Sequence, residues 1–497
     1  NINGAFNKLT ENNSLISMII GAEIRKNRSE NSSLKAAGFY DDALNFIGHA
    51  TGYPTDSKNK PSGNQDLSTE VGFFANANYM YNNRYYADFV YRLSGSSKFG
   101  SNQRYGQFWS GGLGWNLHNE NFLKFEKLNL LKIRGSVGYT GKVNFEPFQS
   151  ITMYKYENTL EYLHGIGAIP QTIGNDDLKW EREFSYNIGA DISLFDRRLN
   201  ATLDFYLKRT KDLVLDASIA PSTGVVSGKQ NIGEMENKGF EFSVDGFIIQ
   251  RNDVWWQLGM NGSTNKNRIL KISNALKRQN ELNNDVAPTR QTPAPLAQYE
   301  EGESTSALKV VRSAGIDPAT GREVFIKLDG TRTFTYSADD KVVVGDTDPR
   351  FYGNVYTNVF YKGFSLYIMG SFKCGGYLYN VTRASRVEGT TGRTNVDRRA
   401  FDSRWKEVGD IALYRKITEH SVPQQTDRFV EKENVLTITS VNLGYEFPQR
   451  ICQKMMLRNL RLGVNLSDIL RFSNVKVERG LDYLYGNGFE FTLSTTF

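Results

Sequence analysis

The histidines are the residues whose chemistry could bind a metal, but their spacing does not suit it. They lie far apart, and no two have the separation of a metal-ligand motif. They are His49, His118, His164 and His420. The chain also lacks a Gly-x-Ser-x-Gly nucleophile elbow and any cysteine–histidine arrangement that would activate a thiol. We therefore expect no catalytic residues, no metal and no cofactor.

Two other groups that could do chemistry have simpler explanations. The run Gly111–Gly114 lies inside a strand pattern and lacks the Gly-Lys-Ser/Thr of a phosphate loop, so we expect it to ease strand curvature or close packing. Cys374 ends a strand pattern and Cys452 lies in a short turn. These positions are at opposite ends of the expected fold, so both thiols should stay unpaired.

Aromatic side chains in the connecting segments are the candidates for substrate binding. Their rings could stack on sugars or line a peptide site, whereas the alternative is loop packing or an aromatic girdle at a membrane interface. The candidates are Tyr154, Tyr156, Tyr162, Trp180, Tyr377 and Tyr379.

Composition excludes several classes of protein. The chain has 497 residues, of which 13% are aromatic, and no stretch approaches the roughly 18 apolar residues of a membrane helix. Its 60 basic and 54 acidic residues nearly balance, so we expect no nucleic-acid partner. The densest basic stretch should be a solvated loop, or a contact for anionic lipid or a partner. It comprises Arg383, Arg386, Arg393, Arg398, Arg399 and Arg404.

Alternation of apolar and polar residues dominates the sequence and predicts long antiparallel strands. Every second residue from Val71 to Tyr81 is apolar or aromatic, and the pattern restarts at Tyr85 after a short turn. Strands of about 10–12 residues are twice the usual length. About fifteen are expected, near 2–8, 13–24, 71–81, 85–95, 105–117, 128–140, 184–194, 199–207, 238–249, 254–264, 353–361, 364–373, 434–447, 458–467 and 489–497.

The connections between these strands alternate between short and long. Short turns on one side and long loops on the other are typical of an antiparallel transmembrane β-barrel in an outer membrane. The long connections are 25–68, 96–104, 141–181, 215–237, 265–352, 374–433 and 468–486. We expect 265–352 and 374–433 to face outside, where they could dock a partner. Phe497, at the end of the last strand, resembles the signature that outer-membrane assembly machinery recognises.

Alternation also assigns the two faces of the wall. Asp191 and Asp204 are expected to point toward the lumen, and the apolar residues that alternate with the polar ones on the same two strands are expected to point toward lipid. The lipid-facing residues on these strands are Ile188, Ile192, Leu203 and Phe205.

Several segments resemble the SusC/RagA-like TonB-dependent outer-membrane transporters. The matching blocks are Gly174–Arg182, Asn187–Asp191, Asp204–Tyr206 with Arg209-Thr210, Asn231–Glu241, Gly345–Arg350 with Tyr361–Phe364, and Leu460–Leu466. The resemblance spans nearly the whole chain. It implies a barrel of about 22 strands with an internal plug. It also implies import of oligosaccharides or oligopeptides beneath a SusD-like surface lipoprotein, powered by TonB-ExbB-ExbD, in a Bacteroidota-type host.

The resemblance has a gap at the N-terminal side. These 497 residues show no plug and no TonB-contacting segment, so 1–497 would be the C-terminal part of the barrel. Because such barrels end in the periplasm, counting back through the strands puts Asn1 outside. We therefore expect upstream sequence, with about seven more strands and a plug, to complete the barrel. Other expected partners are outer-membrane lipid and a second transporter–lipoprotein pair.

Two other functions remain open from the sequence. One is a passive porin without energy coupling, which a conductance measurement would distinguish because a plugged transporter is nearly closed. The other is a surface adhesin or a hydrolase built on a barrel, and the hydrolase would need a cluster of reactive loop residues. Whether the cargo is a glycan or a peptide is left open.

Overall fold

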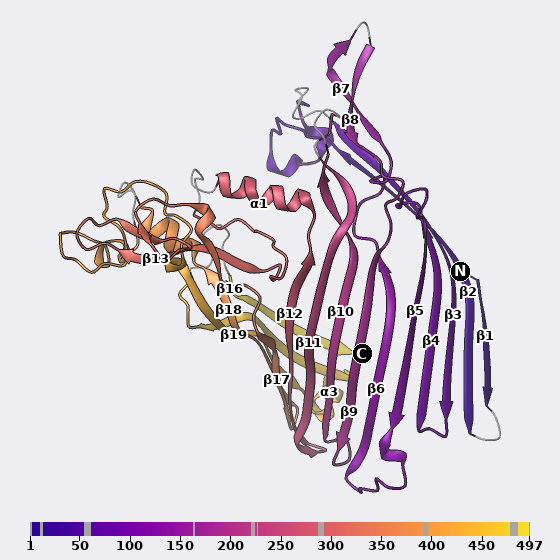
Figure 1. The fold of residues 1–497 in the computed structure, drawn as a ribbon. Helices are drawn as coiled ribbons and strands as arrows, with labels where there is room; N and C mark the ends of the chain where they lie inside the picture. Colours follow the sequence, from indigo (N-terminus) through magenta and orange to yellow (C-terminus); the bar gives the residue numbers. More distant parts are fainter. Residues whose placement is uncertain are drawn as a thin grey trace.

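A single curved antiparallel sheet of fifteen strands forms most of the molecule (Figure 1). The computed structural model describes residues 2–9, 13–53, 61–162, 165–219, 224–225, 227–286, 293–390, 396–477 and 486–496. The strands run in chain order, and the sheet curves so that the C-terminal strands, drawn in yellow, pass behind the middle of the wall. Their bounds are β1 Ile2–Leu9, β2 Ser14–Ser33, β3 Ser62–Tyr81, β4 Tyr85–Ser96, β5 Tyr105–Asn116, β6 Leu128–Lys142, β9 Glu181–Leu194, β10 Leu199–Ser218, β11 Ser227–Arg251, β12 Val254–Lys271, β17 Phe351–Tyr361, β18 Phe364–Tyr379, β19 Val430–Glu446, β20 Asn459–Ser473 and β21 Gly488–Thr496.

All fifteen strands expected from alternation are present, and neighbours in sequence pair as antiparallel hairpins. In the β9–β10 hairpin, for example, Leu194 pairs with Leu199 and the register continues to Arg182 opposite Lys211. The sheet leaves β1 and β21 as edge strands in the described part of the chain. The prediction of a long-stranded antiparallel barrel fold is confirmed.

The two faces of the sheet differ as the alternation predicted. Ile188 and Phe205 are register partners on the outer face, and their side chains are 65% and 60% exposed. Such exposure of large apolar residues fits a lipid-facing belt. Asp191 and Asp204 project to the opposite face, where one guanidinium contacts both. The belt is therefore apolar outside and polar inside.

Several expected loops are shorter than predicted, because the strands continue beyond the apolar belt. The segment 215–237 was expected to be a loop, yet β10 runs to Ser218 and β11 begins at Ser227. The remaining connection is shorter than the turn-side segment between Asn116 and Leu128, so the strict alternation of lengths is wrong. Above the membrane both faces of a strand meet water, so hydrogen bonding continues without apolar alternation.

The remaining long connections contain structure that alternation did not reveal. The segment 141–181 carries a projecting hairpin, β7 (Met153–Tyr162) and β8 (Gly165–Thr172). The segment 265–352 carries α1 (Asn274–Val286) and a small sheet. Its strands are β13 (Ala307–Ile316), β14 (Glu323–Ile326), β15 (Arg332–Thr333) and β16 (Lys341–Asp346). The segment 374–433 contributes the π-helical turn Arg383–Glu388 and α2 (Arg399–Asp402).

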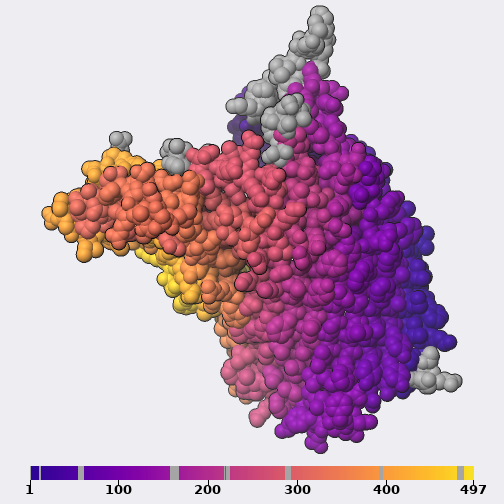
Figure 2. Space-filling view, viewed as in Figure 1, coloured from indigo at the N-terminus to yellow at the C-terminus, as the bar shows by residue number. Residues whose placement is uncertain are grey.

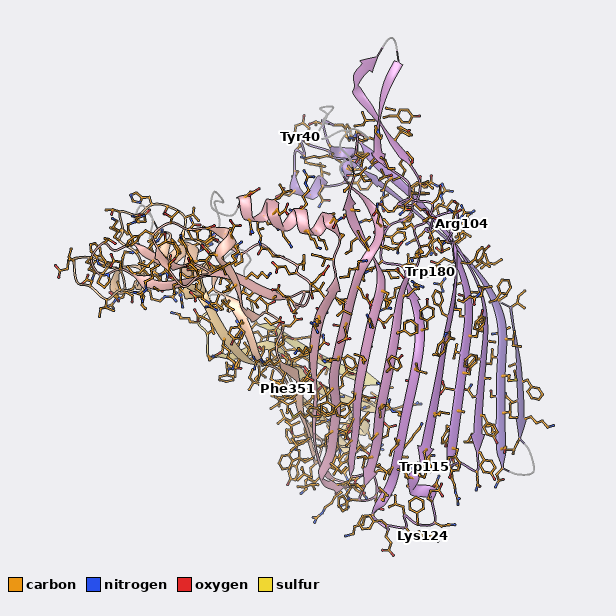
Figure 3. All side chains as sticks on the ribbon, in the orientation of Figure 1. Tyr40, Arg104, Trp115, Lys124, Trp180 and Phe351 are labelled. Carbon is orange, nitrogen blue, oxygen red and sulfur yellow. The ribbon has the colours of Figure 1, made fainter. Side chains whose placement is uncertain are left out.

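Aromatic residues gather at the short-turn end of the barrel. Tyr85 stacks between Tyr81 and Trp115, with ring centroids 6.4 and 6.2 Å apart. Glu120 accepts hydrogen bonds from the Tyr85 hydroxyl (2.8 Å) and the Trp115 indole (3.0 Å). Figure 3 shows Trp115 and Lys124 together at this end. This arrangement is the aromatic girdle of a membrane barrel.

Three smaller expectations concern glycine, cysteine and the last residue. Gly112 lies in β5, where a Cβ would come within 2.4 Å of the Asp88 carboxylate, so the glycine run serves close packing. Cys374 lies in β18, whereas Cys452 lies in α3 (Gln449–Lys454) at the short-turn end of the sheet. Both thiols are free, as predicted. Phe497 lies outside the described residues. Among the helices in the described ranges, none is both long and apolar enough to span a membrane.

Candidate lumen surface and loop module

Charged side chains on β6, β9 and β10 form a linked group on the inner face. Arg134 of β6 donates to the Asp204 carboxylate at 2.6 Å and to the Asp191 carboxylate at 3.3 Å. Gly189 of β9 is the register partner of both Arg134 and Asp204, and a Cβ at this position would come within 2.6 Å of the Asp204 Oδ1. Alternation placed both aspartates correctly but could not name Arg134, which comes from a distant part of the sequence.

Polar side chains continue across β10, β11 and β12. Asp245 accepts hydrogen bonds from the Asn200 amide at 3.2 Å and from the Gln257 amide at 3.3 Å. Farther along, the Asn354 amide donates to Asn261 Oδ1 at 3.3 Å.

A hollow of about 300 Å³ opens on this face and is lined mainly by oxygen- and nitrogen-bearing side chains. Its polar lining residues are Thr202, Asp204, Glu241, Ser243, Asn261, Ser263, Tyr352 and Asn354. Such a surface offers many weak hydrogen bonds to a hydrophilic solute. Of these residues only Asp204 was expected at the lumen from the sequence, although the same alternation could have found the others.

The connections 272–350 and 380–429 pack together into one body, here called the loop module. It projects sideways from the upper ends of β12, β17, β18 and β19 (Figures 1 and 2). Its hydrophobic core combines Leu308 and Val310 of β13 with Ala384 and Phe429 from the other connection. The Val311 amide also donates to the Gln425 carbonyl at 3.0 Å. The two connections therefore hold each other in place.

A buried network of ion pairs joins the two connections of the loop module through Arg428 and Glu323. Arg428 makes two hydrogen bonds to Glu323, at 2.7 and 2.9 Å, and a third to Glu388 at 2.7 Å. Arg415 donates to the same Glu388 oxygen at 2.8 Å. All four side chains are buried or nearly so. Buried charges of this kind need every partner in place.

The arginine stretch 383–404 is only partly the solvated loop that the sequence predicted, because Arg386 and Arg398 are exposed whereas Arg404 is buried. Arg404 is buried and donates hydrogen bonds to four backbone carbonyls between 2.7 and 3.0 Å. Arg383 pairs with Glu431, Arg398 with Asp402 and Arg399 with Asp397. Arg393 lies outside the described residues. Arg404 serves the internal structure because tertiary packing supplies its acceptors, whereas Arg398 stays at the surface.

Burial and charge also shift the acidity of two aspartates in the loop module. Burial raises the pKa of Asp427, although its carboxylate accepts a hydrogen bond from the Ser313 amide. The Arg399 guanidinium holds the pKa of Asp397 well below its usual range. A raised carboxyl pKa means that the stabilising contribution of Asp427 is present in acid and is lost as the pH rises through that value.

Three of the six aromatic candidates lie on the β7–β8 hairpin. Tyr154 is 62% exposed and Tyr156 is 70% exposed. Tyr162 is the last residue of β7, and its side chain lies outside the described residues. Both described tyrosines are accessible to a large ligand or a partner.

Trp180 is held in an aromatic cluster below the hairpin. Its ring lies 4.3 Å from the Phe99 ring and 5.2 Å from the Phe108 ring, between centroids. Its indole donates to the Arg104 carbonyl at 3.3 Å, and Figure 3 shows the two residues side by side. This is the loop-packing alternative rather than an open binding surface.

Tyr377 and Tyr379 belong to the end of β18 and not to a loop. Tyr379 is only 7% exposed and joins the core of the loop module, with its hydroxyl donating to the Gln424 carbonyl at 3.4 Å. Tyr377 packs against the same core and covers Gly345. A buried ring cannot stack on a substrate, so Tyr379 is wrong as a surface contact.

Asn231 connects the two most specific sequence blocks. Its side-chain oxygen accepts from the Lys179 amide at 2.9 Å, and its amide donates to the carbonyls of Lys179 (2.7 Å) and Asp212 (2.9 Å). One side chain thus anchors the loop that enters β9 to the upper ends of β10 and β11.

Replacing Asn231 with alanine should loosen this anchor. The Asn231→Ala variant leaves backbone groups of Lys179 without partners, which costs about 1–3 kcal/mol. Limited proteolysis should then cut 143–180 faster. Asn252→Ala, in an exposed turn, is the control and should leave the cleavage rate unchanged. Equal rates for the two variants would contradict the anchor.

Within the described part of the chain, no group of three or more His, Cys, Asp or Glu side chains could hold a metal ion.

A curved sheet with an apolar belt outside, a polar lumen surface and large loops at one end defines an outer-membrane β-barrel. Residues 6–465 match the family described as "TonB dependent receptor-like, beta-barrel", and the chain belongs to this family. The family comprises outer-membrane transporters rather than enzymes.

Relatives and solved structures agree with this assignment. The chain is 27% identical over 496 residues to the TonB-dependent receptor P3 of Formosa agariphila, covering 94% of this chain and 48% of that protein. It is 35% identical over 214 residues to the TonB-dependent receptor SusC of Bacteroides thetaiotaomicron, covering 41% and 21%. The RagAB peptide transporter structure matches with a TM-score of 0.81 at 23% identity, covering 95% and 51%. The chain spans about half the length of the two relatives that match along most of it.

Proposed function

We propose that this chain is the C-terminal barrel part of an active importer for oligosaccharides or oligopeptides. A SusD-like surface lipoprotein would deliver the cargo, and TonB-ExbB-ExbD would power import through segments beyond these residues. The observation that carries the proposal is a polar inner face on a barrel of the SusC and RagA type. The hydrogen-bonding groups around Asp204 and Asn261 suit a hydrophilic cargo, and oligosaccharides and oligopeptides are both hydrophilic.

Energy dependence separates this proposal from a passive porin. Cells producing the full-length protein that contains this chain would be given fluorescent oligosaccharides or oligopeptides, with and without a protonophore. We expect uptake to stop when the proton gradient collapses, and the purified protein to be nearly closed in a planar bilayer. Uptake that survives the protonophore, together with a steady open conductance, would establish the porin instead.

The exposed tyrosines of the β7–β8 hairpin are the remaining candidates for a cargo contact. Aromatic stacking is worth about 0.5–1.5 kcal/mol per ring, so Tyr154→Ala with Tyr156→Ala should weaken cargo binding by roughly tenfold. Isothermal titration with the cargo that co-purifies with the protein measures this. Tyr361→Ala is the control, because Tyr361 is also exposed but lies beside a short turn. Unchanged binding in the double variant would remove the tyrosines from the cargo site.

The exposed apolar side chains of the segment 401–413 in the loop module support docking of the lipoprotein. Large apolar side chains are exposed there, and contiguous apolar patches on soluble surfaces mark interaction sites. They are Phe401, Val408, Ile411 and Leu413. Ile411→Asp with Leu413→Asp should abolish co-purification of the lipoprotein. Leu328→Asp, an exposed residue on the other connection, should not. If both variants still co-purify with the lipoprotein, the docking site lies elsewhere.

A further inference from the structure

Two lysines face each other on the outer surface of the barrel. Lys238 of β11 is the register partner of Lys266 of β12, and both side chains are exposed. Like charges directly opposite on one face of a sheet repel each other. In the described part of the chain, neither lysine pairs with a carboxylate.

The neighbouring strands neutralise their basic residues at this level. Arg182 of β9 pairs with Asp212, and Arg209 of β10 pairs with Glu234 at 2.5 Å. Lys238 and Lys266 form no ion pair in the described part of the chain, and Arg268, also exposed on β12, adds to the positive charge beside them.

The height of the pair places it at the lipid headgroups. Both lysines lie about a dozen residues above the turn that joins β11 and β12. A tilted barrel strand needs roughly 9–11 residues to cross the hydrocarbon core. The lysine ammonium groups therefore reach the polar layer on the loop side of the membrane.

A row of phenylalanine rings lies just below the lysines on the same outer face. Phe240 is two residues below Lys238 on β11. Its ring centroid lies 4.6 Å from that of Phe205, and Phe242, Phe351 and Phe372 extend the row. Such a row offers acyl chains a flat apolar surface directly beneath two cations.

A cavity of about 640 Å³ adjoins the pair where β12 and β17 diverge. Besides the two lysines, its charged lining includes Arg268 and Arg350 together with Glu236, Asp346 and Asp348. Glu236 is the register partner of Arg268, and Asp346 accepts hydrogen bonds from Ser306 and from the Asp348 amide. In the described part of the chain none of these carboxylates forms an ion pair with either lysine, so the lysine pair stays open to an external anion.

We propose that Lys238 and Lys266 bind a phosphate group of a phosphorylated outer-leaflet lipid whose acyl chains lie on the phenylalanine row. Two ammonium groups supply the charge for the phosphate, and the rings supply apolar contact. The lipid neutralises a repulsion that the protein itself leaves in place. The site thereby fixes one sector of the barrel wall against the membrane.

Native mass spectrometry of the full-length protein with purified lipid A tests this site. Wild-type protein should retain bis-phosphorylated lipid A but not its dephosphorylated form. Lys238→Ala with Lys266→Ala should reduce retention on the order of tenfold or more, since each basic residue adds several-fold to binding at a charged lipid surface. Lys238→Arg with Lys266→Arg should retain the lipid, which separates lost charge from lost fold.

A matched control removes the same charge from the other end. Lys124→Ala with Lys362→Ala deletes two exposed lysines beside the short turns and should leave lipid retention unchanged. Added inorganic phosphate at the lipid's concentration should not displace the lipid, because it lacks acyl chains. The proposal is overturned if wild-type protein retains both lipid forms equally, if the alanine pair behaves like the control, or if inorganic phosphate displaces the lipid.

Discussion

Replacing Arg428 with methionine should open the loop module while the barrel stays folded. Glu323 would then be buried without its only ion-pair partner among the described residues. Glu388 would lose one of its two partners and pair only with Arg415 in that part of the chain. Removing one partner of a buried ion pair costs about 3–5 kcal/mol. Amide hydrogen exchange of β13 and of 426–430, followed by mass spectrometry, should accelerate by a hundredfold or more.

Two comparisons isolate the ion pair. Arg398→Met removes an exposed pair with Asp402 and should change exchange very little. Adding Glu323→Leu to Arg428→Met removes the stranded carboxylate and should recover much of the lost protection. Slow exchange in Arg428→Met would mean that the hydrophobic core around Phe429 holds the module without the ion pairs.

An arginine at position 188 should destabilise the barrel in the membrane. Ile188 lies near the middle of β9 on the apolar outer face and is largely exposed to lipid. A charged side chain at mid-membrane depth costs roughly 2–4 kcal/mol in such barrels. Urea unfolding of the full-length protein in lipid vesicles, monitored by gel mobility of the folded form, measures this loss.

Asn187→Arg is the matched control, one residue away on the inner face. Asn187 shares the polar surface with Asp191, so a cation there stays near water and carboxylates. We expect a much smaller loss of stability. Equal losses at 187 and 188 would contradict the assignment of the two faces.

The sequence determined the barrel wall, because lipid and lumen impose different solvents on alternate residues. Ile188 and Asp191 fall on opposite faces for that reason alone, and the fifteen strands followed from the same period. The ends of the strands were not determined. Beyond the belt, β10 and β11 meet water on both faces, so their upper residues carry no alternating signal.

Only the tertiary structure decided the loop module and the roles of its residues. The sequence predicted that Tyr379 lies in an open loop and that Arg404 is solvated, yet segments distant in sequence bury both side chains. Arg428 meets Glu323 across 105 residues, a separation that no local pattern encodes. The lysine pair on β11 and β12 likewise depends on strand register. A membrane imposes its period on every strand that crosses it, whereas loops take their structure from whichever distant partners they contact.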